Sequence, residues 1–125
     1  MKTNEILELT NQLAEILEQA DEEYNKRRET KEKGDFHDEV KPFADRAHAL
    51  ISEWKEKTSA QLIKNPQKNI HHNQIFATAD NLELVTVQCF FPETSYKRFK
   101  SYVQSSRYVL GQVEMALSRH TGSGE

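Results

Sequence analysis

Three of the five histidines, His71, His72 and His120, carry the side chains best suited to bind a metal ion. If the chain folds as a bundle of helices that alternate in direction, the start of the third helix and the end of the fourth lie at the same end. That arrangement brings the three imidazoles together, close to Glu5 at the start of the first helix. Imidazole and carboxylate groups are ligands that zinc accepts. Because His71 and His72 fall in a loop that imposes no geometry, our prediction is exposed histidines without a metal, and a zinc site is the alternative.

The other side chains able to take part in catalysis lack the neighbours that catalysis needs. Cys89 is the only cysteine, and it completes an apolar stripe, which predicts a buried, unreactive thiol. His71 precedes it by 18 residues, or about 27 Å along a helix, so only His37 is expected at the same end as Cys89. The pair Asp45 and His48 points away from the core on a helical wheel, and it occurs once, whereas a di-iron bundle needs two Glu-x-x-His pairs. The sequence therefore predicts no enzyme and no cofactor.

Composition and charge exclude several classes of partner. The chain has 125 residues, 36% of them hydrophobic and 30% charged, with a net charge of -3, which fits one domain with a core. The basic side chains Lys97, Arg98, Lys100 and Arg107 scatter around a helix, so no nucleic-acid surface is expected. No apolar stretch approaches the ~20 residues that span a membrane, and the polar residues 1–5 are unlike a secretory signal. A single cysteine excludes an internal disulfide, and together these features predict a cytoplasmic protein.

The elements that position these residues are predicted to be four amphipathic helices joined by short polar loops. In the first helix, capped by Thr3 or Asn4, apolar residues recur every three or four positions as far as Tyr24. The charged run at residues 25–33 is then expected to project past the bundle or to fray before Gly34, the predicted C-terminal stop.

The second helix is predicted to be interrupted near Pro42. Asp35 starts a short helical turn that reaches Val40, with Asp38 as the partner in a capping-box-like pair. Pro42 then requires a kink or a restart. Beyond it, apolar residues line one face until the chain reaches Asn65, which precedes another proline.

The third helix is predicted to run from about Asn73 to Phe90. Its last part, residues 82–90, is rich in β-branched residues and partly alternating, which is also typical of a strand. A lone strand has nothing to pair with, so a helix is the better prediction. Thr94 or Ser95 then caps the fourth helix.

Four such helices pack most simply as an antiparallel up-and-down four-helix bundle, an all-α fold. The bundle is expected to occupy residues 1–120. A flexible C-terminal tail is expected at residues 121–125, where glycine and serine alternate.

Several short pieces of sequence occur in a characteristic order between residues 35 and 117. They are Asp35-Phe36, Val40-Lys41-Pro42, Trp54, Leu62-Ile63-Lys64, Gln74-Ile75, Leu82-Glu83-Leu84-Val85 and Lys97-Arg98-Phe99-Lys100. In order and rough spacing they resemble the YppE-like family, small uncharacterised proteins of Gram-positive bacteria. The resemblance implies a four-helix up-and-down bundle, including a helix at residues 82–90. It implies no activity and no catalytic residues, because the family looks like a domain of unknown function.

The side of the third helix opposite its core stripe is more apolar than a solvated face should be. The residues on this side are Phe76, Leu84, Val87 and Phe91. Our first interpretation is that the segment before Pro42, which carries Phe36 and Val40, folds over them. The alternative is a surface for a protein partner or for self-association.

The leading functional hypothesis is a small cytoplasmic interaction or scaffold protein without catalysis, which presents helix faces to another macromolecule. The second hypothesis is a bundle that binds a metal or a small ligand at the histidine-rich end.

Overall fold

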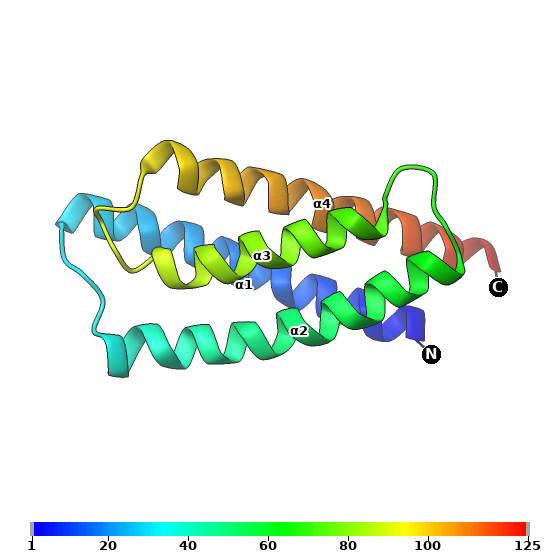
Figure 1. Cartoon of the computed structure of the whole chain (residues 1–125), viewed down its shortest axis with the longest axis horizontal. Helices are drawn as coiled ribbons and strands as arrows, with labels where there is room; N and C mark the ends of the chain where they lie inside the picture. The colour runs from blue at the N-terminus through cyan, green and yellow to red at the C-terminus, as the bar shows by residue number, and fades with distance from the viewer. Residues whose placement is uncertain (1, 125) are drawn as a thin grey trace.

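Four long helices lie side by side in the computed structural model, which describes the backbone of residues 2–124 and the side chains of residues 4–118. The helices are α1 (Lys2–Thr30), α2 (Lys41–Lys64), α3 (His72–Gln88) and α4 (Tyr96–Gly124), and a short π-helix, η1 (Phe36–Val40), precedes α2. Figure 1 shows that successive helices alternate in direction, so that α1 begins and α4 ends at the same end of the bundle. The predicted antiparallel four-helix bundle is confirmed, and no described residue lies in a strand.

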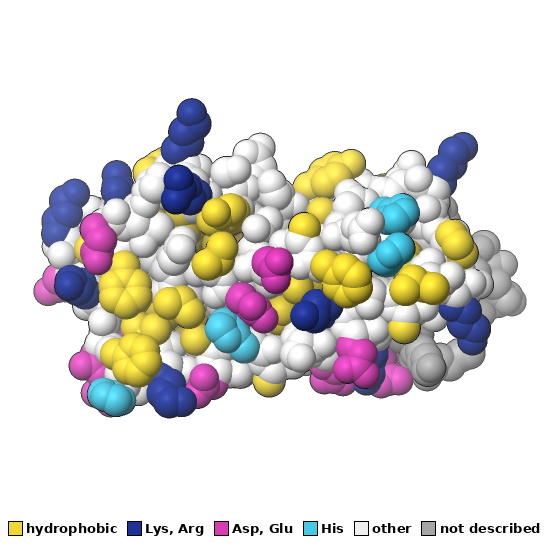
Figure 2. Space-filling view, viewed as in Figure 1, with side chains coloured by type: hydrophobic (Ala, Val, Ile, Leu, Met, Phe, Trp, Pro, Cys, Tyr) yellow, Lys and Arg dark blue, Asp and Glu magenta, His cyan; other side chains and the backbone are white. Residues whose placement is uncertain are grey.

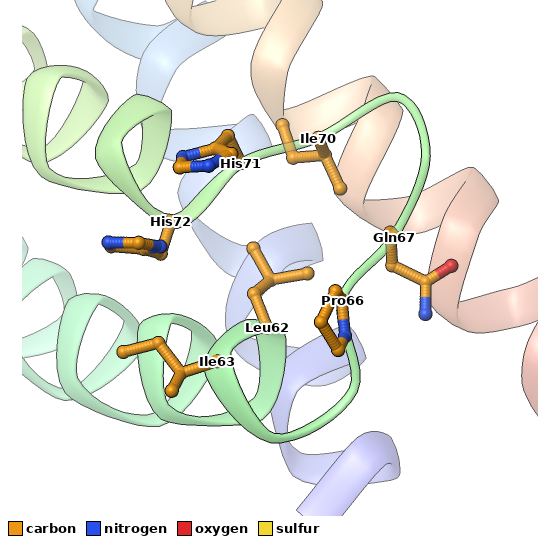
Figure 3. Close-up of a pocket in the computed structure, with 7 residues that line it drawn as sticks. All are labelled: Leu62, Ile63, Pro66, Gln67, Ile70, His71 and His72. Atoms are coloured by element: carbon orange, nitrogen blue, oxygen red, sulfur yellow. The ribbon is translucent and has the colours of Figure 1, made fainter.

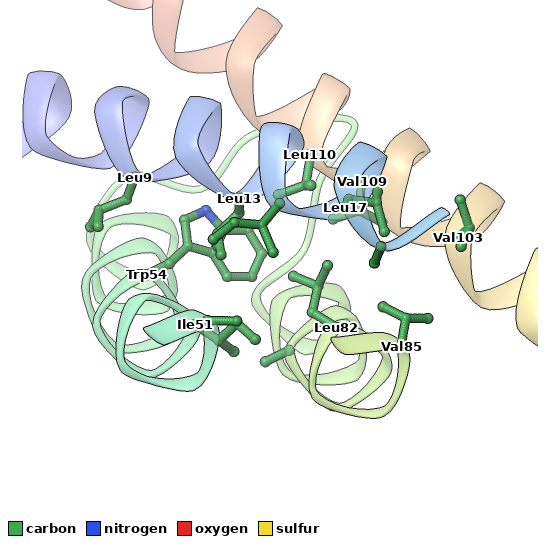
Figure 4. Packing of buried hydrophobic residues seen from close by; sticks show 14 of the residues in the cluster. Leu9, Leu13, Leu17, Ile51, Trp54, Leu82, Val85, Val103, Val109 and Leu110 are labelled. Atoms are coloured by element: carbon green, nitrogen blue, oxygen red, sulfur yellow. The ribbon is translucent and has the colours of Figure 1, made fainter. Parts of the chain in front are cut away.

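The core lies between the four helices and receives apolar side chains from each of them (Figure 4). Every helix packs against its two neighbours in the ring, and α1 also touches α3. Trp54 from α2, Leu13 from α1 and Leu82 from α3 are fully buried. Burying one large apolar side chain stabilises a fold by roughly 1.5–3 kcal/mol. This closed core, rather than the helix propensity of the separate segments, therefore holds the bundle together.

The end of α1 differs from the prediction. The helix stops at Thr30, and Lys31 has a φ of 66°, the left-handed conformation that commonly terminates a helix. Its N–H donates to the carbonyl oxygen of Arg27 at 2.7 Å. Gly34 is therefore not the residue that terminates α1. It instead allows the chain after α1 to pass close to Phe90. Its N–H donates to the carbonyl oxygen of Phe90 at 2.8 Å, and a Cβ at this position would lie 2.8 Å from the Cβ of Phe90, so only glycine permits this close approach.

The charged end of α1 stays helical as far as Thr30 and packs on the bundle through Arg27, which continues the buried stripe of the helix. Arg27 is only 7% exposed. Its guanidinium donates to Glu23 at 2.7 Å, to Glu39 at 2.6 Å and to the carbonyl oxygen of Lys33 at 3.1 Å. It also lies 5.8 Å from the centre of the Phe90 ring. A charged residue occupies a core position here because each part of its guanidinium has a partner.

The chain between α1 and α2 is organised by Asp35 and Glu39. As predicted, Asp35 caps the short turn, because its carboxylate accepts from the N–H of Asp38 at 2.7 Å. The returning bond comes from Glu39 rather than Asp38, since the Glu39 carboxylate accepts from the N–H of Asp35 at 2.8 Å. Pro42 sits in the first turn of α2, and η1 passes directly into α2. The kink at Pro42 stays a prediction.

The starts of α3 and α4 lie close to their predicted positions. α3 begins one residue before the expected Asn73 and ends two residues before Phe90. Of the two predicted caps of α4, Ser95 accepts from the N–H of Arg98 at 3.3 Å, whereas the hydroxyl of Thr94 donates back to Gln88. α4 runs to Gly124, and the flexibility expected of residues 121–125 stays a prediction.

Candidate functional site

The histidines at the α2–α3 end have structural partners. His71 is the N-cap of α3, where its Nδ1 accepts from the N–H of Asn73 at 3.5 Å. Gln74 completes a capping box, because its side-chain oxygen accepts from the N–H of His71 at 2.8 Å. The rings of His71 and His72 stack with their centres 4.7 Å apart. The rings of His72 and Phe76 lie nearly perpendicular, with their centres 6.0 Å apart.

The structure brings together only part of the proposed zinc ligand set. His71 and His72 are adjacent, but the side chain of His120 lies outside the described residues. Glu5 accepts a hydrogen bond from Lys57 at 2.8 Å. Among the side chains of residues 4–118, no three His, Cys, Asp or Glu residues lie close enough to hold a metal ion.

Cys89 is a buried free thiol, as predicted from its place in the apolar stripe. Burial raises the pKa of this thiol, because a thiolate would lose its hydration, and the negative charge of Glu23 acts in the same direction. The thiol donates a long bond to the carbonyl oxygen of Thr86 at 3.8 Å. His37 is exposed and stacks edge-on with Phe36. A thiol held in its protonated form is a poor nucleophile.

The Asp45 and His48 pair is also structural. Asp45 pairs with Lys41 at 2.7 Å in the first turns of α2. His48 is half-buried, and its Nε2 lies 3.2 Å from the hydroxyl of Thr86 on α3. Although His48 points away from the core on the helical wheel, its contact with Thr86 links α2 to α3.

Acidic residues of α1 compensate part of the basic set on α4. The guanidinium of Arg107 makes two bonds to Glu18, at 2.7 and 2.9 Å. Lys100 bonds to Asp21 at 2.7 Å and to Asn25 at 2.6 Å. These pairs reduce the charge that α4 offers to a polyanion.

The outer side of α3 remains partly uncovered, which contradicts our first interpretation. Phe76 is 42% exposed and Leu84 41% exposed, whereas Val87 and Phe91 are half-buried against the core. Phe36, expected to cover them, is itself 57% exposed. The nearby Val40 is buried in the core cluster, and η1 packs mainly against α2. Figure 2 shows the face that carries α2 and α3, where hydrophobic side chains are interspersed with histidine, acidic and basic side chains.

A hollow of about 430 Å³ lies on this outer side of α3. Leu84 and Val87 supply its apolar surface, and Asp80, Glu83 and Gln88 complete the lining. We call it the α3 hollow. Neither Asp80 nor Glu83 forms an ion pair with any described side chain. The side-chain oxygen of Gln88 is buried without a hydrogen-bond partner among the described residues.

Sequence reasoning found Leu84 and Val87 from their place on the helical wheel, but it missed the acidic residues beside them. The signal was present, because Asp80, Glu83, Leu84 and Val87 are spaced by three and four residues and so share one side of a helix. The sequence does not show which acidic residues form ion pairs in the folded protein. It therefore could not show that Asp80 and Glu83 form none with a described side chain.

None of the described helices is both long enough and apolar enough to cross a membrane.

Comparisons with known proteins agree on one family. A bacterial domain of unknown function, DUF1798, matches residues 10–117. The uncharacterised protein YppE of Bacillus subtilis (strain 168) is 27% identical over 119 residues, which cover 95% of this chain and 97% of YppE. The crystal structure of YppE matches with a TM-score of 0.92 at 26% identity, covering 98% of this chain and 99% of that one. A Listeria innocua protein of unknown function matches with a TM-score of 0.91 at 27% identity, over 97% of both chains.

These matches span nearly the whole bundle, and they confirm the resemblance to the YppE-like family drawn from the short sequence pieces. The chain therefore belongs to the bacterial family of unknown function DUF1798.

Proposed function

We propose that this protein is a non-catalytic interaction protein of the cytoplasm, which binds a basic amphipathic helix of a partner protein at the α3 hollow. The observation that carries the proposal is that exposed Leu84 lines the same hollow as two carboxylates, Asp80 and Glu83, that form no ion pair with a described side chain. No nucleic acid, membrane or cofactor enters this proposal.

The shape of the surface suits a helix as the partner. Phe76 and Leu84 are eight residues apart on α3, which is about 12 Å at the helical rise. Val87 lies three residues beyond Leu84 and borders the same hollow. A row of this length matches the apolar face of two helical turns, and helices commonly dock in this way through residues spaced by three and four.

The charges specify a basic partner. An apolar segment placed over Leu84 excludes water from Asp80 and Glu83, and a carboxylate that loses its hydration without a counter-ion is strongly unfavourable. Lysine or arginine residues flanking the apolar segment offset this cost and speed the encounter. Rim charges of this kind govern specificity and association rate more than affinity.

The same charges argue against self-association through this surface. In a two-fold dimer the same patch meets itself, so Asp80 and Glu83 of one copy would approach those of the other. Like charges that face each other across an interface destabilise the complex by roughly several kcal/mol. A heterologous basic partner is therefore the occupant that we propose.

Affinity capture from the source bacterium tests this proposal with three variants. Leu84→Lys and Glu83→Lys each place a cation in the hollow, and Met115→Lys places the same cation on an exposed position of α4. We expect a captured protein with a basic amphipathic helix, retained by the wild type and by Met115→Lys and lost with both hollow variants. Circular dichroism checks that all variants stay folded. Capture that is equal in all four proteins, or a partner without such a helix, contradicts the proposal.

A self-associating protein gives a different result. Size-exclusion chromatography with light scattering would then show a dimer that Leu84→Lys converts to a monomer. This result would overturn the choice of a heterologous partner.

A further inference from the structure

We infer that the end of the bundle where α2 meets α3 binds a small amphipathic carboxylate, a molecule with a short aliphatic chain and one anionic group. The site is a hollow of about 240 Å³ beside the connecting loop. Its apolar lining comes from Leu62, Ile63, Pro66 and Ile70. Its polar lining comes from His71 and His72, which lie together, and from Gln67, which lies beside Pro66 at the opposite end of the hollow (Figure 3). It shares no lining residue with the α3 hollow, so the two proposals stand independently.

The apolar side is a fixed surface rather than a loose loop. Leu62 is 4% exposed and Ile70 3% exposed, so both side chains are anchored in the core. Ile63, at 62% exposure, forms an open rim. Pro66 restricts the backbone between them. A preformed apolar wall with few polar groups is the usual character of a small-ligand site.

The size of the hollow limits the ligand. The hollow has a volume of about 240 Å³. This is smaller than most sites for drug-sized molecules. A short-chain acid such as hexanoate fits these dimensions.

The polar side offers a hydrogen-bond donor to an anion. Because the Nδ1 of His71 accepts from the N–H of Asn73, the neutral imidazole carries its proton on Nε2. The ring of His72 stacks on His71 with centres 4.7 Å apart and borders the same hollow. Figure 3 shows both rings on one side of the hollow, across from Leu62 and Ile63. A carboxylate at this edge would accept from Nε2–H of His71 while its chain lies against the apolar wall.

The local charge also favours an anion. From Thr58 to Ala79 the sequence contains no Asp or Glu, while it contains Lys64 and Lys68 beside lining residues of the hollow. Neither lysine forms an ion pair with a described side chain. Unpaired lysines in this stretch of the chain raise the local concentration of an anion. The α3 hollow has the reverse character, so one ligand is not expected to use both.

Nuclear magnetic resonance with the full chain tests the inference. The probe is hexanoate, and hexanol and hexylamine serve as neutral and cationic ligands of matched length. We expect amide shifts confined to residues 62–74 that saturate with a dissociation constant on the order of millimolar, as suits so small a ligand. Hexanol should bind about tenfold more weakly, and hexylamine should give no localised shift.

Two variants with a matched control locate the site. Ile63→Glu replaces an exposed apolar side chain of the hollow with a carboxylate, which repels the carboxylate of hexanoate. It should raise the dissociation constant of hexanoate by about tenfold or more. Met115→Glu makes the same change at an exposed residue of α4 and should leave binding unchanged. His72→Ala removes the ring that stacks on His71 at the edge of the hollow. It should therefore weaken the binding of hexanoate more than the binding of hexanol.

Several results would overturn the inference. Equal binding of hexanoate and hexanol would show an apolar hollow without preference for an anion. Hexanoate binding that survives Ile63→Glu, shifts spread over the whole bundle, or no shift up to about 20 mM hexanoate would each exclude this site.

Discussion

The guanidinium of Arg27 lies 2.6 Å from the carboxylate of Glu39, and this contact joins the end of α1 to the short helix before α2. Glu39 also accepts from the N–H of Asp35. One carboxylate thus fixes both sides of the connecting segment. The pKa of Glu39 is lowered, first by the bond from the Asp35 N–H and then by the bond from Arg27.

Glu39 therefore makes part of the stability depend on pH. Because its folded pKa lies below the ordinary value of 4.5, its contribution is present above pH 4.5 and is lost as the pH falls through the folded pKa. We expect Glu39→Gln to be less stable than the wild type at neutral pH, with the difference shrinking at acid pH. Chemical denaturation at a series of pH values measures this, and a difference that stays constant with pH would refute it.

Arg27 is predicted to contribute more to the free energy of unfolding than an exposed arginine does. Arg27→Ala removes the bonds to Glu23, Glu39 and the Lys33 carbonyl and the contact with Phe90. We expect the free energy of unfolding to fall by about 2 kcal/mol. Arg98→Ala, on the exposed side of α4, should change it by less than about 0.5 kcal/mol. Urea denaturation compares the two, and equal effects would mean that Arg27 is an ordinary surface residue.

A buried hydrogen bond between α1 and α2 gives a second test of the core. The indole N–H of Trp54 donates to the Thr10 hydroxyl at 2.9 Å, and that hydroxyl donates to the carbonyl oxygen of Ile6 at 2.7 Å. Thr10→Val leaves the indole N–H buried without an acceptor, which should cost about 2 kcal/mol.

Thr58→Val is the matched control. The Thr58 hydroxyl is buried and has no hydrogen-bond partner among the described residues, so a methyl group in its place should be neutral or stabilising. Thermal and urea unfolding of both variants measure the contrast. If Thr58→Val were the more destabilising of the two, the hydrogen bonding assigned to this core would be wrong.

Zinc is predicted to leave the melting temperature unchanged. His71 already caps α3 through Nδ1, and Glu5 is bonded to Lys57, so binding an ion would break existing contacts. A thermal melt of chelator-treated protein with and without zinc chloride measures the effect. A rise in melting temperature that disappears in His71→Ala with His120→Ala would establish the zinc site instead.

The four-helix bundle could be predicted from the sequence because the apolar stripe of each helix indicates which side is buried. Arg27 was harder to predict, since an arginine in a core position depends on partners such as Glu39 and Lys33 that only folding brings near. Lys31 was missed because glycine is the usual residue in a left-handed helix stop, and Gly34 stood nearby. His71 had a signal that was overlooked, because Gln74 follows three residues later in the pattern of a capping box.

The candidate surface on α3 could also be predicted only in part. The helical wheel located Phe76 and Leu84 on the outer side of α3, but it gave no information on whether another segment covers them. Phe36 is apolar and close in sequence to Pro42, so covering was a reasonable expectation. In the structure Phe36 is 57% exposed and Leu84 is 41% exposed, so Phe36 does not cover this part of α3.

The proposal that the α3 hollow binds a basic amphipathic helix is tested most directly by photo-cross-linking from inside the hollow. A benzophenone amino acid replaces Leu84 in the source bacterium, and the same replacement at Met115 is the control. We predict a cross-link from position 84 alone, to a partner peptide whose apolar residues are spaced by three and four and flanked by lysine or arginine. A cross-link to a second copy of this chain, to an acidic segment, or with equal yield from position 115 would contradict it.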